Sequence, residues 1–192
     1  MLVALVLLLV GVIHAAGAAP VLPSGVDVTV ASASTGRTLP SGFLGLSTEY
    51  SALEPYAGGN PAAIDPVFVH LVRNLSPGQA PVLRIGGDST DWTWWPVPGV
   101  SQPPGATYTL KPRWLNVAHA LGQALGAKYI LGLNLEANST AVASTEAQQL
   151  LSGIGSRSVT AFELGNEPEL YGQFPWYHDA AGHEVTGRPT SY

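Results

Sequence analysis

The stretch SVTAFELGNEPELYG, residues 158–172, decides the fold. Its first part, Ser158–Gly165, is mostly apolar and predicts a β-strand. Pro168 cannot continue a strand, because it has no backbone N–H to donate. The pair Asn166-Glu167 therefore lies directly after the strand. In α/β barrels this end of a parallel strand faces the substrate, so Glu167 is a candidate general acid/base.

Three further strands precede this one, and helical patterns separate them. A helix start is predicted at Asp65-Pro66, where an N-capping side chain precedes a proline at the first helical position. The expected strands are Phe43–Tyr50, Pro81–Gly87 and Lys128–Leu135, and the expected helices are Val67–Leu75, Pro112–Gly126 and Thr140–Ile154. Alternating strands and helices favour a parallel sheet. We expect an α/β fold: an incomplete (β/α)8 TIM barrel of about the first four β/α units.

A small doubly wound sheet is the alternative fold, but Ile85-Gly86-Gly87-Asp88 has the glycines of a dinucleotide fingerprint without its remaining spacing. Upstream of the barrel, Asp27–Ser32 alternates with period two and predicts a strand of an appended β-sandwich. The expected organisation is an export signal peptide at 1–19, an N-terminal strand segment at 20–41, and the N-terminal half of a catalytic barrel at 42–192.

The apolar start of the chain, its net charge and its lack of cysteine indicate where the protein acts and which binding partners are excluded. The apolar run that begins the chain is too short to span a bilayer and is followed by small residues, which is typical of a cleaved export signal; an uncleaved anchor is the alternative. We therefore expect a secreted protein. The net charge of −5 and 11% charged residues argue against nucleic acid. Without cysteine, disulfides and thiolate ligands are excluded.

Acidic residues occur at the carboxyl end of every expected strand. Such positions share the catalytic face of a barrel, although a strand-end acid can also cap the following helix. The long irregular segment 88–112 supplies tryptophans that suit a sugar pocket, because indole rings pack on sugar C–H groups. The acids are Glu49, Asp88, Asp91, Glu136, Glu167 and Glu169, and the tryptophans are Trp92, Trp94 and Trp95.

Three segments together resemble glycoside hydrolase family 79, the β-glucuronidase and heparanase-like enzymes. They are GFLGLSTEY (42–50), LRIGGDSTDW (83–92) and NEPELYG (166–172). The resemblance implies a retaining β-glucuronidase-like hydrolase with a carbohydrate substrate and no metal or other cofactor. Glu167 would be the general acid/base, Asn166 would bind the sugar 2-hydroxyl, and Glu49 and Asp88 would hold other sugar hydroxyls. A helix-capping or salt-bridged acid is the alternative for Glu167, and it is a stronger alternative for Glu49 and Asp88.

A retaining mechanism also needs a nucleophilic carboxylate, which the resembled family takes from a later strand. Asp179 and Glu184 lie in an expected polar loop and do not replace it. The sequence thus predicts a fragment that is inactive by itself. A non-catalytic carbohydrate-binding or decoy protein and a barrel glycosidase for another sugar are the alternatives.

Two smaller predictions concern charged side chains. Arg84 lies within an apolar strand, and we expect it to pair with a buried acid such as Glu163 instead of substrate. The histidines in His178-x4-His183-Glu184 match no zinc spacing, so a solvated loop without metal is expected there.

Overall fold

The computed structural model describes residues 28–33, 36–39 and 42–187, in two units that divide after Arg37. The expected export segment 1–19 lies outside the described residues. The strand predicted at Asp27–Ser32 is wrong where it is described: 28–33 is irregular, and Val28 and Val30 are 79% and 89% exposed. An alternating segment forms a strand only when its backbone groups find a partner strand, and none pairs with it in the described chain.

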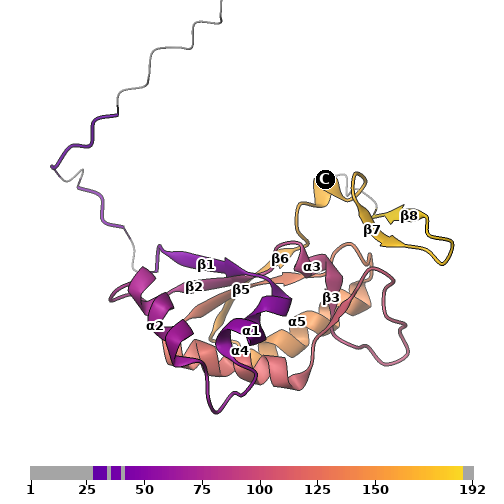
Figure 1. Cartoon of the computed structure of the whole chain (residues 1–192), viewed down its shortest axis with the longest axis horizontal. Coiled ribbons are helices and arrows are strands. Elements are labelled where there is room, and N and C mark those ends of the chain that lie inside the picture. Colours follow the sequence, from indigo (N-terminus) through magenta and orange to yellow (C-terminus); the bar gives the residue numbers. More distant parts are fainter. Residues whose placement is uncertain (1–27, 34–35, 40–41, 188–192) are drawn as a thin grey trace, which may run out of the picture. The chain divides into compact units, whose positions relative to one another are not determined.

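A four-stranded parallel sheet forms the centre of the second unit (Figure 1). Its spatial order β1-β2-β5-β6 follows the order along the chain, and each neighbouring pair is parallel. The strands are β1 (Gly45–Thr48), β2 (Val82–Ile85), β5 (Lys128–Leu133) and β6 (Val159–Leu164). This confirms the α/β class and all four strand predictions, with each strand shorter than its sequence pattern, β5 at its carboxyl end only.

The three predicted helices are present between these strands as α2 (Pro66–Leu75), α4 (Pro112–Leu125) and α5 (Thr140–Ile154). The Asp65 carboxylate accepts hydrogen bonds from Val67 N and Phe68 N at 2.8 and 3.0 Å, which caps the helix that starts with Pro66. Gly126 ends another helix in the left-handed region at φ 65°. The short elements η1 (Tyr50–Ala52), α1 (Leu53–Ala57) and α3 (Ser89–Trp92) were not predicted.

The chain after β6 differs from the expected loop. It forms η2 (Pro168–Leu170) and then an antiparallel hairpin of β7 (Pro175–His178) and β8 (Glu184–Thr186). Asp179 fixes the turn, because its carboxylate accepts from Ala181 N and His183 N at 2.8 and 2.9 Å. A second small sheet pairs β3 (Thr93–Trp94) with β4 (Tyr108–Thr109) inside the long segment 88–112.

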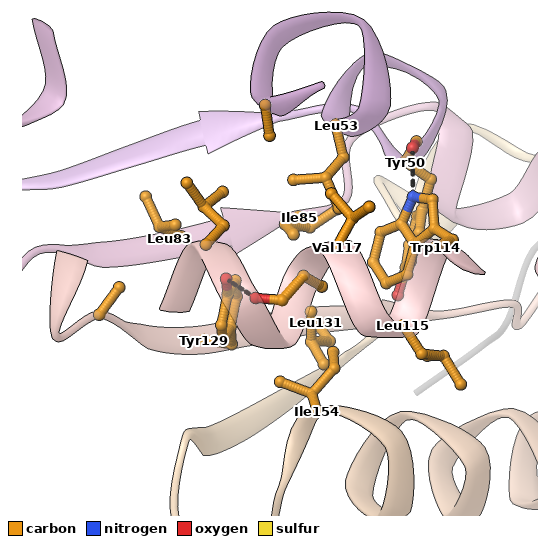
Figure 2. Close-up of a cluster of buried hydrophobic side chains, with 14 of the residues drawn as sticks. Tyr50, Leu53, Leu83, Ile85, Trp114, Leu115, Val117, Tyr129, Leu131 and Ile154 are labelled. Carbon is orange, nitrogen blue, oxygen red and sulfur yellow. Dashed lines mark hydrogen bonds between the residues drawn. The ribbon is translucent and has the colours of Figure 1, made fainter. Parts of the chain in front are cut away.

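The hydrophobic core is built from the sheet and the helices α1, α2, α4 and α5, and Figure 2 shows part of it. Its largest members also satisfy their polar atoms. The Trp114 indole N–H donates to the Tyr50 carbonyl at 2.9 Å, and the Tyr129 hydroxyl donates to the Ala118 carbonyl at 2.6 Å. Buried aromatic residues with satisfied polar groups give a well-determined core, so the strand ends above it are held in fixed positions.

An ion pair links strands on the face of the sheet opposite to this core. Arg84 alternates with the buried Leu83 and Ile85 along β2 and therefore points to the other face. Its guanidinium donates to both oxygens of Glu163 on β6, at 2.7 and 2.6 Å. The predicted pairing of Arg84 with Glu163 is thus confirmed, although both side chains are about a third exposed.

Candidate functional site

The carboxyl ends of β2, β5 and β6 meet around a pocket of about 350 Å³. Three of the four residues predicted for the site line it, namely Asp88, Asn166 and Glu167. The fourth, Glu49, is not among its lining residues. The remaining members of the lining are Asp91, Trp92, Glu136, Leu170, Tyr171, Phe174, Pro175 and Trp176.

Glu167 has an unusual backbone conformation. Its φ of 49° and ψ of 52° lie in the left-handed region, which only Asn138 shares among the non-glycine residues of the described chain. Such a conformation costs about 1 kcal/mol or more and persists only when the surroundings fix it. The side chain is exposed, and its carboxylate has no hydrogen bond or ion pair within 42–187. The carboxylate is thus held at the pocket and remains available to a ligand.

Asn166 is oriented by contacts on three sides. Its backbone N–H donates to Asp91 at 2.8 Å, and its side-chain amide donates to Asp88 at 3.0 Å. The amide oxygen accepts from Arg84 at 3.2 Å, so the ion pair beneath the pocket also fixes which way the amide points. The predicted substrate residues Asn166 and Asp88 are therefore brought together in direct contact.

Asp91 joins the ends of β5 and β6. One carboxylate oxygen accepts from Leu135 N and Glu136 N at 2.9 and 3.0 Å. The other accepts from Asn166 N and the Tyr171 hydroxyl, both at 2.8 Å. Burial raises the pKa of Asp91, and these donated hydrogen bonds oppose that rise. With four donors already bound, Asp91 orients the site and has no free lone pair for a ligand.

Glu136 is the acid with the most altered titration on the pocket wall. Burial is the main cause that raises its pKa to about 7, and the negative charge of Asp91 adds to it. A hydrogen bond from the Gly187 backbone acts in the opposite direction. Glu136 is therefore partly protonated at neutral pH. The sequence placed it at a strand end, but its proximity to Asp91 depends on the fold.

Glu49 holds the start of α3. Its carboxylate accepts from the backbone N–H of Ser89 at 2.9 Å, and it lies against Gly87 so closely that a Cβ at that glycine would overlap it. The structure thus gives Glu49 a helix-terminal contact. The Glu49 side chain thus lies against Gly87, next to Asp88, and is not part of the pocket lining.

The aromatic wall differs from the one expected. Trp92 lines the pocket and is 43% exposed, but Trp94 is buried and Trp95 packs against the main core. Successive residues of an extended segment point in opposite directions, so adjacent tryptophans do not share one wall. Phe174 and Trp176 take their place. The dense aromatic residues after Tyr171 were the available indication of this in the sequence.

The chain matches no known protein-family model, and no curated protein matches it at a significant level. Within the described ranges there is no cluster of three acids or histidines able to hold a metal ion. Nδ1 of His183 instead lies 3.2 Å from Oδ2 of Asp179 in the hairpin turn. No helix of the described chain has the length and apolar character needed to cross a membrane. The arrangement that stands out is an exposed carboxylate beside an oriented amide, which suits proton transfer to a hydroxyl-bearing ligand.

Proposed function

We propose that this chain carries the acid/base side of the active site of a secreted retaining glycoside hydrolase that resembles the β-glucuronidases of family 79. Glu167 protonates the glycosidic oxygen as its bond to the sugar breaks. Asn166 donates to or accepts from the sugar 2-hydroxyl, and Asp88 holds a neighbouring hydroxyl. In this proposal the four parallel strands are the first half of a (β/α)8 barrel, with which the parallel sheet is compatible.

The observation that carries the proposal is the placement of Glu167. Its carboxylate follows a parallel strand at the carboxyl edge of the sheet, lines the pocket and makes no contact that would occupy it in the described structure. Its left-handed backbone is the kind of local strain that clusters at functional sites. A capping or salt-bridged acid would not need that conformation.

The other pocket acids are poorly suited to be the nucleophile. Both oxygens of Asp91 are occupied by donors, and Asp88 already accepts from Asn166. Glu136 is partly protonated at neutral pH, and a protonated carboxyl group is a weak nucleophile. We therefore expect no hydrolysis by the 192-residue chain unless an external nucleophile replaces the missing carboxylate.

Azide provides the test. With the full chain, phenyl β-D-glucuronide and azide, we expect azide to attack the anomeric carbon while the carbon–oxygen bond breaks. The electron pair goes to the phenol oxygen, which takes its proton from Glu167. The product is an α-linked glucuronosyl azide, detected by NMR and mass spectrometry, and Glu167→Gln should reduce its rate by about 100-fold. An unchanged rate in Glu167→Gln would contradict the role of Glu167.

A non-catalytic carbohydrate-binding protein is the second candidate, because the pocket combines hydrogen-bonding groups with aromatic rings. If this second candidate is right, the chain binds glycosides but forms no glycosyl azide.

Replacing the glucuronide with phenyl β-xyloside or arabinoside in the same assay tests the sugar preference.

A further inference from the structure

Two asparagines of the chain lie in the acceptor sequence for N-linked glycosylation, Asn-x-Ser/Thr. They are Asn74 in Asn74-Leu75-Ser76 and Asn138 in Asn138-Ser139-Thr140. A transferase that recognises this sequence joins a sugar to the side-chain amide of the asparagine, and it requires the hydroxyl of the serine or threonine. Neither asparagine is among the lining residues of the pocket.

Asn138 lies in an exposed turn between β5 and α5. Its backbone N–H donates to the Leu135 carbonyl at 2.9 Å. Its φ of 47° lies in the left-handed region, which asparagine adopts more readily than most residues with a side chain. The residue is exposed, and its side-chain amide makes no hydrogen bond in the described chain. The amide nitrogen can therefore be modified without breaking a contact of the fold.

The hydroxyl that the acceptor sequence requires is accessible as well. Thr140 is the first residue of α5 and is exposed, and its side chain makes no hydrogen bond within 42–187. Ser139, between the two, is extended at φ −134° and ψ 110°, and its hydroxyl accepts from Val142 N at 3.4 Å. Because Ser139 caps the helix, Thr140 is not needed for that contact.

The sequence at Asn74 is arranged differently. Asn74 is exposed, but it lies in the last turn of α2. The required hydroxyl belongs to Ser76, which is buried and donates to the Val72 carbonyl at 3.0 Å. Pro77 follows directly and restricts the backbone of Ser76. This segment thus offers an exposed amide without an accessible hydroxyl.

We propose that Asn138, and not Asn74, is the attachment site of an N-linked glycan. The donor is an oligosaccharide that is joined to a lipid through pyrophosphate. A bond forms between Nδ2 of Asn138 and the anomeric carbon of the first sugar, while the bond between that carbon and the pyrophosphate oxygen breaks. The electron pair leaves with the lipid pyrophosphate, and Nδ2 gives one proton to a base of the transferase. The inference rests on the secretion in the proposed function, because this modification occurs on exported chains.

The glycan would be attached close to the candidate site without being part of it. The hydrogen bond from Asn138 N to the Leu135 carbonyl closes a turn that also contains Glu136. Glu136 lines the pocket, whereas Asn138 does not. A bulky, hydrophilic group would therefore project from the turn that carries one of the pocket acids.

Production of the full chain in yeast tests the proposal. One arm keeps the expected export signal at 1–19, and a second arm replaces it with the leader of a secreted yeast protein, so that export does not depend on it. Intact mass is measured before and after treatment with peptide N-glycosidase in heavy-oxygen water. That enzyme converts a glycosylated asparagine to an aspartate that carries the heavy isotope, which peptide mapping then locates. We expect a glycan at Asn138 and none at Asn74.

Matched variants separate the acceptor sequence from the fold. Thr140→Val keeps Asn138 and the Ser139 cap but removes the required hydroxyl, so the carbohydrate mass should be lost completely. Thr140→Ser keeps the hydroxyl and should keep the glycan. Asn74→Asp is the control at the second acceptor sequence and should leave the carbohydrate mass unchanged.

The outcomes distinguish this inference from the proposed secretion. With the yeast leader, a chain without a glycan at Asn138 overturns the inference, as does a glycan at Asn74 or a glycan that persists in Thr140→Val. Chains from the medium and from the cell extract are scored alike, because the sugar is transferred before a chain leaves the cell. If the chain is glycosylated only with the yeast leader, the proposed secretion fails while the assignment of Asn138 stands.

Discussion

Glu146 on α5 should make the protein less stable as the pH rises, and Glu146→Gln should remove that effect. The side chain is fully buried. One carboxylate oxygen accepts from Asn134 N at 3.0 Å, and the other has no partner in the described structure. Burial raises the pKa of Glu146 to about 8, and the negative charge of Asp91 adds to the rise. At neutral pH the folded protein therefore holds this carboxyl in its protonated form.

The size of the effect follows from proton linkage. An unfolded chain releases this proton near the ordinary glutamate value of 4.5, and the folded protein releases it near pH 8. Between these values the folded state holds more protons, so the free energy of unfolding falls by about 1.4 kcal/mol for each pH unit. Below pH 4.5 Glu146 contributes nothing, and above pH 8 it costs about 5 kcal/mol. At pH 7 the cost is about 3 kcal/mol.

Glutamine stays neutral in both states and can still accept from Asn134 N. We expect Glu146→Gln to be more stable than the wild-type protein by about 3 kcal/mol at pH 7 and by less than about 1 kcal/mol at pH 5. Urea unfolding at pH 5, 6, 7 and 8, followed by tryptophan fluorescence, measures the difference. Glu136 titrates in both proteins, so its contribution cancels. A difference that does not change with pH would refute the reasoning.

Two substitutions test the sheet, and one titration tests the pocket. Arg84→Met removes a bidentate but partly exposed ion pair with Glu163 and should lower the free energy of unfolding by about 1–2 kcal/mol in urea. Gly132→Ala places a methyl group inside the Thr90 side chain and should lower the free energy of unfolding by about 2 kcal/mol or more. The Glu136 carboxyl should titrate with a midpoint near pH 7 in ¹³C NMR, because burial and a nearby charge disfavour its ionised form.

Matched variants give the controls for these measurements. Arg113→Met breaks an exposed pair with Glu54 and should not change stability measurably. Gly59→Ala adds a methyl group to an open position and should be neutral. An effect of Arg84→Met no larger than that of Arg113→Met would show that the pair with Glu163 is not structural. A Glu136 midpoint near 4.5 would mean that its carboxyl is well solvated.

The parallel sheet was predictable because its determinants are local. Apolar runs broken by glycine or proline predict strands, and Asp65-Pro66 predicts a helix start, without knowledge of distant contacts. The alternation in Asp27–Ser32 can also be read from the local sequence alone, but the described part of this segment is not a strand. Pairing depends on a second strand, which alternation alone cannot supply. The β7–β8 hairpin was missed for the opposite reason, since its aromatic, irregular sequence has no alternation to detect.

The residues of the candidate site also include some that local sequence patterns predict correctly and one that they do not. Asp88, Asn166 and Glu167 were found because parallel strands bring their carboxyl ends to one edge. Glu49 satisfies the same rule, yet it contacts Ser89 N, which a strand-end position cannot predict. The distinction depends on the direction of one side chain after the strand ends, a property that local patterns do not contain.

The electrostatics of the site depend on contacts between residues far apart in sequence. Asp91 follows β2, but its carboxylate binds backbone groups at the ends of β5 and β6. Its negative charge also raises the pKa of both Glu136 and Glu146. One buried acid thus fixes the strand ends that support Glu167, and its charge adds to burial, the main cause, in raising the pKa of two neighbouring carboxyls. Because both effects come from the same side chain, the shape of the pocket and its proton content should change together when Asp91 is altered.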